Sequence, residues 1–307
     1  MDIFIQQLIN GLTLGAVYAV VALGYTMVYG IIQLINFAHG DVVMVGAMVA
    51  FSVIVALAPS GLPPLVVVLV ATGCAVSACM LIGYAMERLA YRPLRGAPRL
   101  APLITAIGVS IILQHLAMMI WSRNPLAFPQ LIKTQSYDIG GATVTNVQIA
   151  ILAISVAIMS GLVALVYRTR LGTAMRATAQ NPQVAGLMGI DANRVIAFTF
   201  VIGAALAAVA GVMVASYYGI AHYAMGSQLG LKAFCAAVLG GIGNIPGAML
   251  GGVLLGLVEA LGAGYIGDLT GNVFGSNYQD VFAFVVLIGV LVLRPSGLLG
   301  ERVGDRA

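Results

Sequence analysis

The sequence predicts an all-α integral membrane protein, a polytopic bundle of eight or nine transmembrane helices with discontinuous segments. Its residues are 61% apolar and 8% charged, whereas about a quarter of the residues of a soluble domain are charged. The mean hydropathy is +1.04. No Lys or Arg precedes Arg88, and eleven of the 14 basic residues fall in three short segments. The apolar stretches between these segments are long enough for helices that cross a bilayer.

The three basic segments, residues 88–99, 168–194 and 294–306, indicate the orientation of the chain. Lys and Arg are enriched on the cytoplasmic side of membrane proteins, so these segments are predicted to be cytoplasmic. Counting spans from them places the N-terminus in the periplasm and the C-terminus in the cytoplasm of a bacterial inner-membrane protein. The net charge of +4 is explained by this topology. The sequence has no basic face interleaved with aromatic residues, which would indicate a nucleic-acid partner. Its Cys residues have no spacing that would indicate a metal site.

Nine apolar segments follow one another along the chain. The segment Leu229–Ile242 is short and rich in glycine, and the number of spans depends on it. If it crosses, there are nine spans and the last basic segment is cytoplasmic, which is the preferred interpretation; a re-entrant segment would leave eight. The other eight segments are Leu8–Gly30, Val42–Leu57, Leu65–Met86, Ala101–Trp121, Val147–Tyr167, Val195–Tyr217, Ala248–Gly264 and Val281–Leu293.

No linker or shift in composition divides the chain. Residues 1–307 are therefore predicted to form a single transmembrane domain that contains a cytoplasmic loop at residues 168–194. Glycine is abundant, with 38 residues, and where it is spaced by four it lets two helix backbones approach closely. General enrichment of glycine in membrane helices explains any one such pair, but three pairs favour a tightly packed bundle. The pairs are Gly11 and Gly15, Gly247 and Gly251, and Gly252 and Gly256.

A first group of polar residues interrupts the apolar pattern at Asn36, His39, Gly40 and Asp41. A plain turn at the inner membrane surface accounts for them about as well as a functional site does. In the functional interpretation, Gly40 lets the helix unwind, while the polar side chains satisfy the freed backbone groups and face the protein interior. These residues would then line or brace a transport pathway.

A second interruption contains Gly243, Asn244 and Pro246 in a glycine-rich run. Proline disfavours helix at the residue before it, so a helix should restart near Ile245. Both interruptions place an Asn and a Gly before an aliphatic helix, one in each half of the chain. This short similarity weakly indicates two structural repeats, which transporters commonly use to frame a central pathway.

Charged residues inside the apolar segments are few. Glu259 lies in the middle of one, and an unpaired carboxylate there would be costly. It is therefore expected to be protonated or hydrogen-bonded, and it adds a third candidate to the pathway. Lys232 and Asp280 lie near predicted membrane boundaries and are expected to extend toward the surface.

The segment of residues 168–194 has the character of a soluble helix. Asn181 and Pro182 suit the start of a short helix, and Gly189 suits its end. Between them, Val184 and Leu187 fall on one face, which either docks on another protein or lies against this one. The chain contains no Walker A motif and no catalytic constellation, so it is not expected to be an enzyme or to bind a cofactor, and ATP would be hydrolysed by another subunit.

Four long runs of sequence carry a family resemblance: residues 24–41, 87–93, 194–212 and 232–252. They resemble the LivH-type permease of bacterial ABC importers for branched-chain amino acids. The resemblance implies a homologous LivM-type permease, two cytoplasmic ATPase subunits and a periplasmic solute-binding protein as partners. It also implies a coupling element that fits a groove on the ATPase, and the segment Arg176–Ile190 resembles that element. Docking of a short helix concentrates its energy in a few buried side chains, so Ala185 or Leu187 is expected to face the groove. The coupling residues are Arg176, Ala177, Asn181, Pro182, Ala185, Leu187, Gly189 and Ile190.

Three functions follow from these observations. The leading one is a permease subunit of an importer for Leu, Ile and Val. A related importer permease for urea, short-chain amides or other amino acids is the alternative, because a binding protein usually supplies specificity in such systems. A self-sufficient secondary transporter or channel is the third, and it requires ion-coupling carboxylates within the spans, where only Glu259 is well placed.

Overall fold

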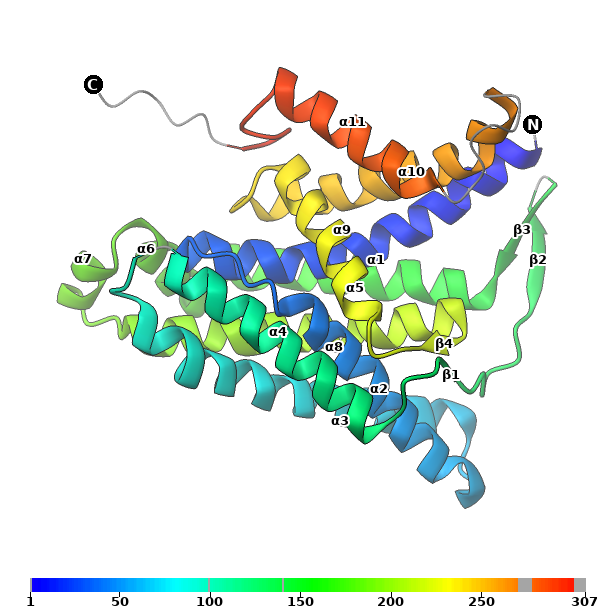
Figure 1. Ribbon diagram of the computed structural model, residues 1–307, viewed down its shortest axis with the longest axis horizontal. Helices are drawn as coiled ribbons and strands as arrows, with labels where there is room; N and C mark the ends of the chain where they lie inside the picture. The colour runs from blue at the N-terminus through cyan, green and yellow to red at the C-terminus, as the bar shows by residue number, and fades with distance from the viewer. Residues whose placement is uncertain (1, 99, 140, 270–277, 301–307) are drawn as a thin grey trace. The chain divides into compact units, whose positions relative to one another are not determined.

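The computed structural model describes residues 2–98, 100–139, 141–269 and 278–300, and nearly all regular structure in them is helical (Figure 1). Seven of the described helices are long and apolar enough to cross a membrane. Each coincides with a segment expected from the sequence, so the all-α polytopic fold is confirmed. They are α1 (Asp2–Ile32), α2 (His39–Leu57), α3 (Pro64–Ala85), α4 (Leu100–Ile120), α5 (Asn146–Arg168), α8 (Ala192–Tyr218) and α10 (Ile245–Leu269).

Two further apolar helices are shorter, α9 (Met225–Gly240) and α11 (Gln279–Leu293). The 16 residues of α9 extend about 24 Å, whereas the hydrocarbon core of a bilayer is about 30 Å thick. This helix therefore crosses only if adjoining residues complete the span. The count of nine spans rather than eight stays a prediction. The inner loop folds into α6 (Arg170–Gln180) and α7 (Pro182–Leu187), as its amphipathic pattern predicted.

Short elements connect the long helices. The helix α3 continues into a π-helix, η2 (Met86–Tyr91), and 3-10 turns form η1 (Ala58–Ser60) and η3 (Arg92–Leu94). The loop of residues 122–146 contains strands that the sequence did not reveal. The two-residue strand β1 (Leu126–Ala127) pairs antiparallel with β4 (Ile220–Ala221), and β2 (Ser136–Ile139) forms a hairpin with β3 (Ala142–Thr145), whose strands run side by side in Figure 1.

The chain folds into two compact units. Unit 1 comprises Met1–Thr26, Thr134–Met159 and Lys232–Ala307, and unit 2 comprises Met27–Lys133 and Ser160–Leu231. Both units are discontinuous in sequence, and α1, α5 and α9 contribute residues to each. That the two units together form a single transmembrane domain stays a prediction.

In unit 1, the glycine pairs lie where helices approach each other. A Cβ atom added to Gly15 of α1 would lie 2.7 Å from the Cα atom of Val253 in α10, and one added to Gly11 would lie 2.8 Å from that of Leu257. The backbones of Gly252 and Gly256 face α1, and those of Gly247 and Gly251 face α9. All three spaced pairs therefore serve close helix contacts, as predicted, and gain dispersion contacts that lipid does not supply.

In unit 2, the core is formed by α2, α3 and α8, which pack against one another. A Cβ atom on Gly46 of α2 would lie 2.6 Å from the Cα atom of Ala208 in α8, so these two backbones touch. Buried side chains around this contact are small or aliphatic, including Val43, Ala47 and Ala207. The same device, a residue without a side chain at a helix crossing, organises each unit separately.

Candidate functional site

The first helix interruption lies in unit 2, between α1 and α2, where residues 33–38 are not helical. Gln33 has a positive φ of 52°, which is uncommon for a residue other than glycine, and it directly follows the end of α1. Asn36, His39 and Asp41 are all buried, as the functional interpretation predicted. The break at residues 33–38 and the first turn of α2 therefore direct polar side chains into the interior of unit 2.

Two details of the predicted break are wrong. Gly40 is not the unwound residue, because α2 already begins at His39. A Cβ atom on Gly40 would lie 2.7 Å from the Cα atom of Gly230 in α9, so this glycine permits a close helix contact. The Asn36 and Asp41 side chains also bond to other side chains rather than to freed backbone groups.

The partners of these polar side chains come from other helices of unit 2. The Tyr91 hydroxyl donates a hydrogen bond to Asn36 Oδ1 at 2.7 Å, and Gln114 Nε2 of α4 donates one to Asp41 Oδ1 at 3.0 Å. Buried carboxyl and amide groups in a membrane protein require such partners. The sequence analysis did not identify Tyr91 or Gln114 as partners of these side chains. A Gln within an apolar segment is a signal that could have identified Gln114.

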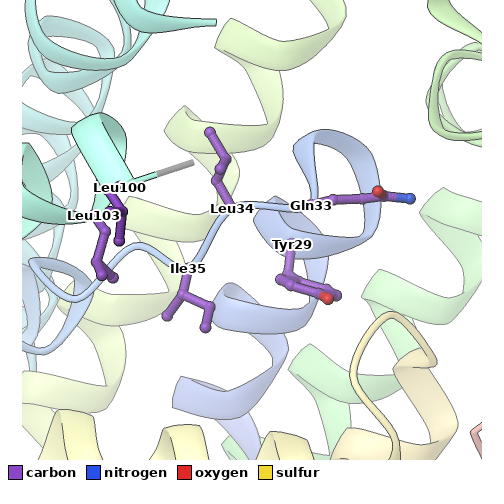
Figure 2. A pocket seen from close by; sticks show the side chains of 6 residues that line it. All are labelled: Tyr29, Gln33, Leu34, Ile35, Leu100 and Leu103. Atoms are coloured by element: carbon purple, nitrogen blue, oxygen red, sulfur yellow. The ribbon is translucent and has the colours of Figure 1, made fainter. Parts of the chain in front are cut away.

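A pocket opens beside the first break, with a cavity volume of about 260 Å³. Figure 2 shows that Tyr29 comes from the end of α1 and that Gln33, Leu34 and Ile35 come from the connecting segment. Two residues of α4, Leu100 and Leu103, complete the lining. Four aliphatic side chains with one amide and one phenol form a surface suited to a small, largely apolar solute.

The second interruption lies in unit 1, between α9 and α10. Gly241 and Gly243 have φ values of 103° and 94°, which favour glycine. The helix α10 restarts at Ile245, directly before Pro246, as predicted. Asn244 accepts a hydrogen bond from the backbone N–H of Gly247 at 3.0 Å and so caps this helix.

The two interruptions differ in construction. Asn244 caps α10 and also donates a hydrogen bond to the backbone oxygen of Leu299 at 2.7 Å, whereas no side chain caps α2. Gly243 and Pro246 are exposed, and Asn36 is buried. The two interruptions therefore do not share the local geometry that a structural repeat would give them.

Glu259 occupies the interior of unit 1, with 1% of its surface exposed. Its carboxylate accepts a hydrogen bond from the Tyr18 hydroxyl at 3.0 Å and lies 2.7 Å from Lys232 Nζ. The ammonium group of Lys232 also lies 2.7 Å from the Asp280 carboxylate. The prediction that Glu259 is hydrogen-bonded is confirmed, and the prediction that Lys232 extends to the surface is wrong, because Lys232 is turned toward two carboxylates.

The inner loop has the caps that its sequence predicted. Asn181 accepts hydrogen bonds from the backbone N–H groups of Gln183 and Val184, and Gly189 follows the helix with a φ of 83°. Leu187 is 87% exposed, but Ala185 is only 3% exposed. The prediction that Ala185 faces a partner is therefore wrong, since the chain itself covers this side chain.

Helices of membrane-spanning length that enclose buried and mutually bonded polar side chains define a multi-pass helical membrane protein. A family model described as the permease component of the branched-chain amino acid transport system matches residues 7–291, and the chain belongs to this family.

Relatives within the family cover almost the whole chain. The protein BraD of Pseudomonas aeruginosa, a high-affinity branched-chain amino acid transport system permease, is 48% identical over 97% of this chain and 96% of its own length. LivH of Escherichia coli K12, which carries the same description, is 45% identical over 97% of this chain and 96% of its own length. A probable branched-chain amino acid transport permease of Methanocaldococcus jannaschii is 29% identical over 91% of this chain and 87% of its own length. No solved structure matches this chain significantly.

Proposed function

We propose that this chain is the permease subunit of an ATP-driven importer that moves leucine, isoleucine and valine across the bacterial inner membrane. The match of the family model over residues 7–291 carries the proposal. The identities of 48% and 45% to permeases described as high-affinity transporters of branched-chain amino acids support the substrate class. The aliphatic lining of the pocket at Leu34, Ile35 and Leu103 is compatible with such solutes.

The chain requires partners in this role. It contains no Walker A motif, so ATP would be bound and hydrolysed by two separate cytoplasmic subunits, and it needs no cofactor of its own. A second homologous permease would complete the pathway, and a periplasmic binding protein would deliver the solute. The exposed end of α7, at Leu187 and Met188, is the surface on which the ATPase docks in this proposal.

Pathway roles are assigned to the polar residues at the interruptions. Asn36, His39 and Asp41 would brace the first break, and Asn244 would brace the second. Glu259 is assigned to bracing rather than to ion coupling, because Lys232 and Tyr18 already engage its carboxylate. This pairing favours an ATP-driven importer over a secondary transporter that uses Glu259 to carry a proton.

The experiment is reconstitution of the chain with its partner permease, ATPases and binding protein in proteoliposomes. Uptake of radiolabelled leucine should require ATP, and an excess of unlabelled isoleucine or valine should compete with it. Competition by urea or a short-chain amide, with no effect of valine, would instead support the alternative substrates. Uptake by the chain without the ATPases would contradict the proposal.

A further inference from the structure

The inner end of α3 departs from the regular α-helix. In the π-helix η2, the backbone N–H of Arg92 bonds to the carbonyl oxygen of Glu87, five residues earlier. Single π turns are rare and are frequently found at functional sites. This turn carries two buried polar residues, Glu87 and Tyr91, each 1% exposed. All of its contacts described below lie within unit 2.

Tyr91 connects η2 to the first helix interruption and to α8. Its hydroxyl donates the 2.7 Å hydrogen bond to Asn36, and its ring lies 5.1 Å from the ring of Phe200 in α8. Asn36 is 4% exposed, so no water replaces this bond if it is lost. A displacement of Tyr91 would therefore act directly on the segment that precedes α2.

Glu87 connects η2 to the beginning of α8. Its carboxylate pairs with the guanidinium of Arg95, and Arg95 Nη1 donates a hydrogen bond to Asn193 Oδ1 at 2.6 Å. Burial lowers the pKa of the Arg95 guanidinium, and the Glu87 carboxylate opposes that shift. Asn193 is the second residue of α8 and lies four residues after Gly189, where the proposed docking segment ends.

A close contact also holds the last turn of α3, which continues into η2, against α8. A Cβ atom on Gly83, in the last turn of α3, would lie 2.6 Å from the Cβ atom of Ala204 and 2.9 Å from the carbonyl oxygen of Phe200. Close packing of this kind transmits small shifts because the contact leaves no free space to absorb them. Movement of α8 therefore also moves the end of α3.

We propose that Glu87, Tyr91 and Arg95 are positioning residues that transmit movement of the junction between α7 and α8 to the helix break at Asn36. The proposal rests on the proposed function, since it takes α7 as the surface that the ATPase moves. Hydrogen bonds connect Asn193 through Arg95 to Glu87, and a separate one connects Tyr91 to Asn36. The backbone of η2, which carries both Glu87 and Tyr91, joins these two parts. It gives the buried polar groups of η2 a role in coupling ATP hydrolysis to opening of the pathway.

The principal variant is Tyr91→Phe, which retains the ring against Phe200 and removes only the hydroxyl. Tyr84→Phe is the matched control, because the Tyr84 hydroxyl is on the same helix, accepts a hydrogen bond from Arg88 and is 41% exposed. In the reconstituted importer, leucine taken up per ATP hydrolysed should fall about tenfold for Tyr91→Phe, the order expected for one buried hydrogen bond. Basal ATP hydrolysis and ATPase co-purification should stay at wild-type levels, and Tyr84→Phe should match wild type throughout.

A purely structural role would lower thermal stability and leave the ratio of uptake to ATP hydrolysis unchanged. If Tyr91→Phe is not recovered from the membrane, Asn193→Ala serves as a second variant, since Asn193 is exposed and its loss leaves no buried cavity. It should lower the same ratio, and a normal ratio in whichever variant is recovered overturns the proposal. Leu187→Asp forms a separate arm: if it retains the ATPases, the docking assignment fails, independently of the result at Tyr91.

Discussion

Lys232 Nζ lies 2.7 Å from Glu259 Oε1 and thereby joins α9 to α10 inside unit 1. The same ammonium group lies 2.7 Å from Asp280 in α11, so one cation links three successive apolar helices. The side chains of Lys232 and Glu259 are 14% and 2% exposed. Since charges are stable in such surroundings only when paired, each of these two groups depends on the other.

We predict that Lys232→Met strongly destabilises the protein. The variant leaves the carboxylates of Glu259 and Asp280 without their cation, and removing one member of a buried pair costs about 3–5 kcal/mol. Glu259→Gln should be less harmful alone, because its amide still accepts a hydrogen bond from Tyr18. The measurement is the melting temperature of the detergent-solubilised protein.

The control for Lys232 is an exposed ion pair in the same chain, Arg194 with Asp191, whose side chains are 82% and 50% exposed. Arg194→Gln should change the melting temperature little, because exposed pairs contribute at most about 1 kcal/mol. The double variant Lys232→Met with Glu259→Gln should be more stable than Lys232→Met alone. Equal melting temperatures for all these variants would show that the buried pair does not stabilise unit 1.

The second prediction concerns orientation. With the native cysteines replaced, Lys133→Cys should react with a membrane-impermeant maleimide added outside the cell, and Arg92→Cys should not, because the basic segments are predicted to face the cytoplasm. Both positions are exposed. Arg302→Cys tests α9 although Arg302 lies outside the described residues: labelling from outside would mean that this short helix does not cross.

Most of the fold could be predicted because membrane helices are specified by length and apolar content, which are local properties of the sequence. The start of α10 at Ile245 and the cap at Asn181 were predicted as well, since proline and asparagine impose local geometry wherever they occur. The π-turn of η2 was not predicted; it directly follows the turn of α3 in which Gly83 approaches α8, and a single sequence does not record that approach.

The candidate site could be predicted only in part. Asn36 and Glu259 attract notice as polar residues in apolar surroundings, but their partners Tyr91 and Lys232 lie on other helices. Which side chains meet depends on how the helices pack, and a single sequence does not record it. The orientation of Ala185 was wrong for the same reason, since neighbouring parts of the chain cover one face of α7.

The last prediction tests docking of the ATPase at α7. Leu187 is 87% exposed in a segment proposed to be cytoplasmic, and an exposed leucine on a capped short helix is suited to fill a groove of a partner. Leu187→Asp should leave membrane insertion and the melting temperature unchanged, because this side chain is largely free of the rest of the chain. It should weaken ATPase co-purification about 30-fold, the change expected when an anchor worth about 2 kcal/mol is lost from an interface.

Ala185→Asp provides the contrast, because Ala185 is 3% exposed and a carboxylate there would be buried without a partner. This variant should lower the melting temperature, and any loss of the ATPase would then follow from misfolding. Arg92→Glu tests the neighbouring inner loop, where Arg92 is exposed. If Leu187→Asp binds the ATPases at wild-type level and Arg92→Glu does not, the docking surface belongs to the loop after α3, because only the surface that contacts the partner should respond to a new negative charge.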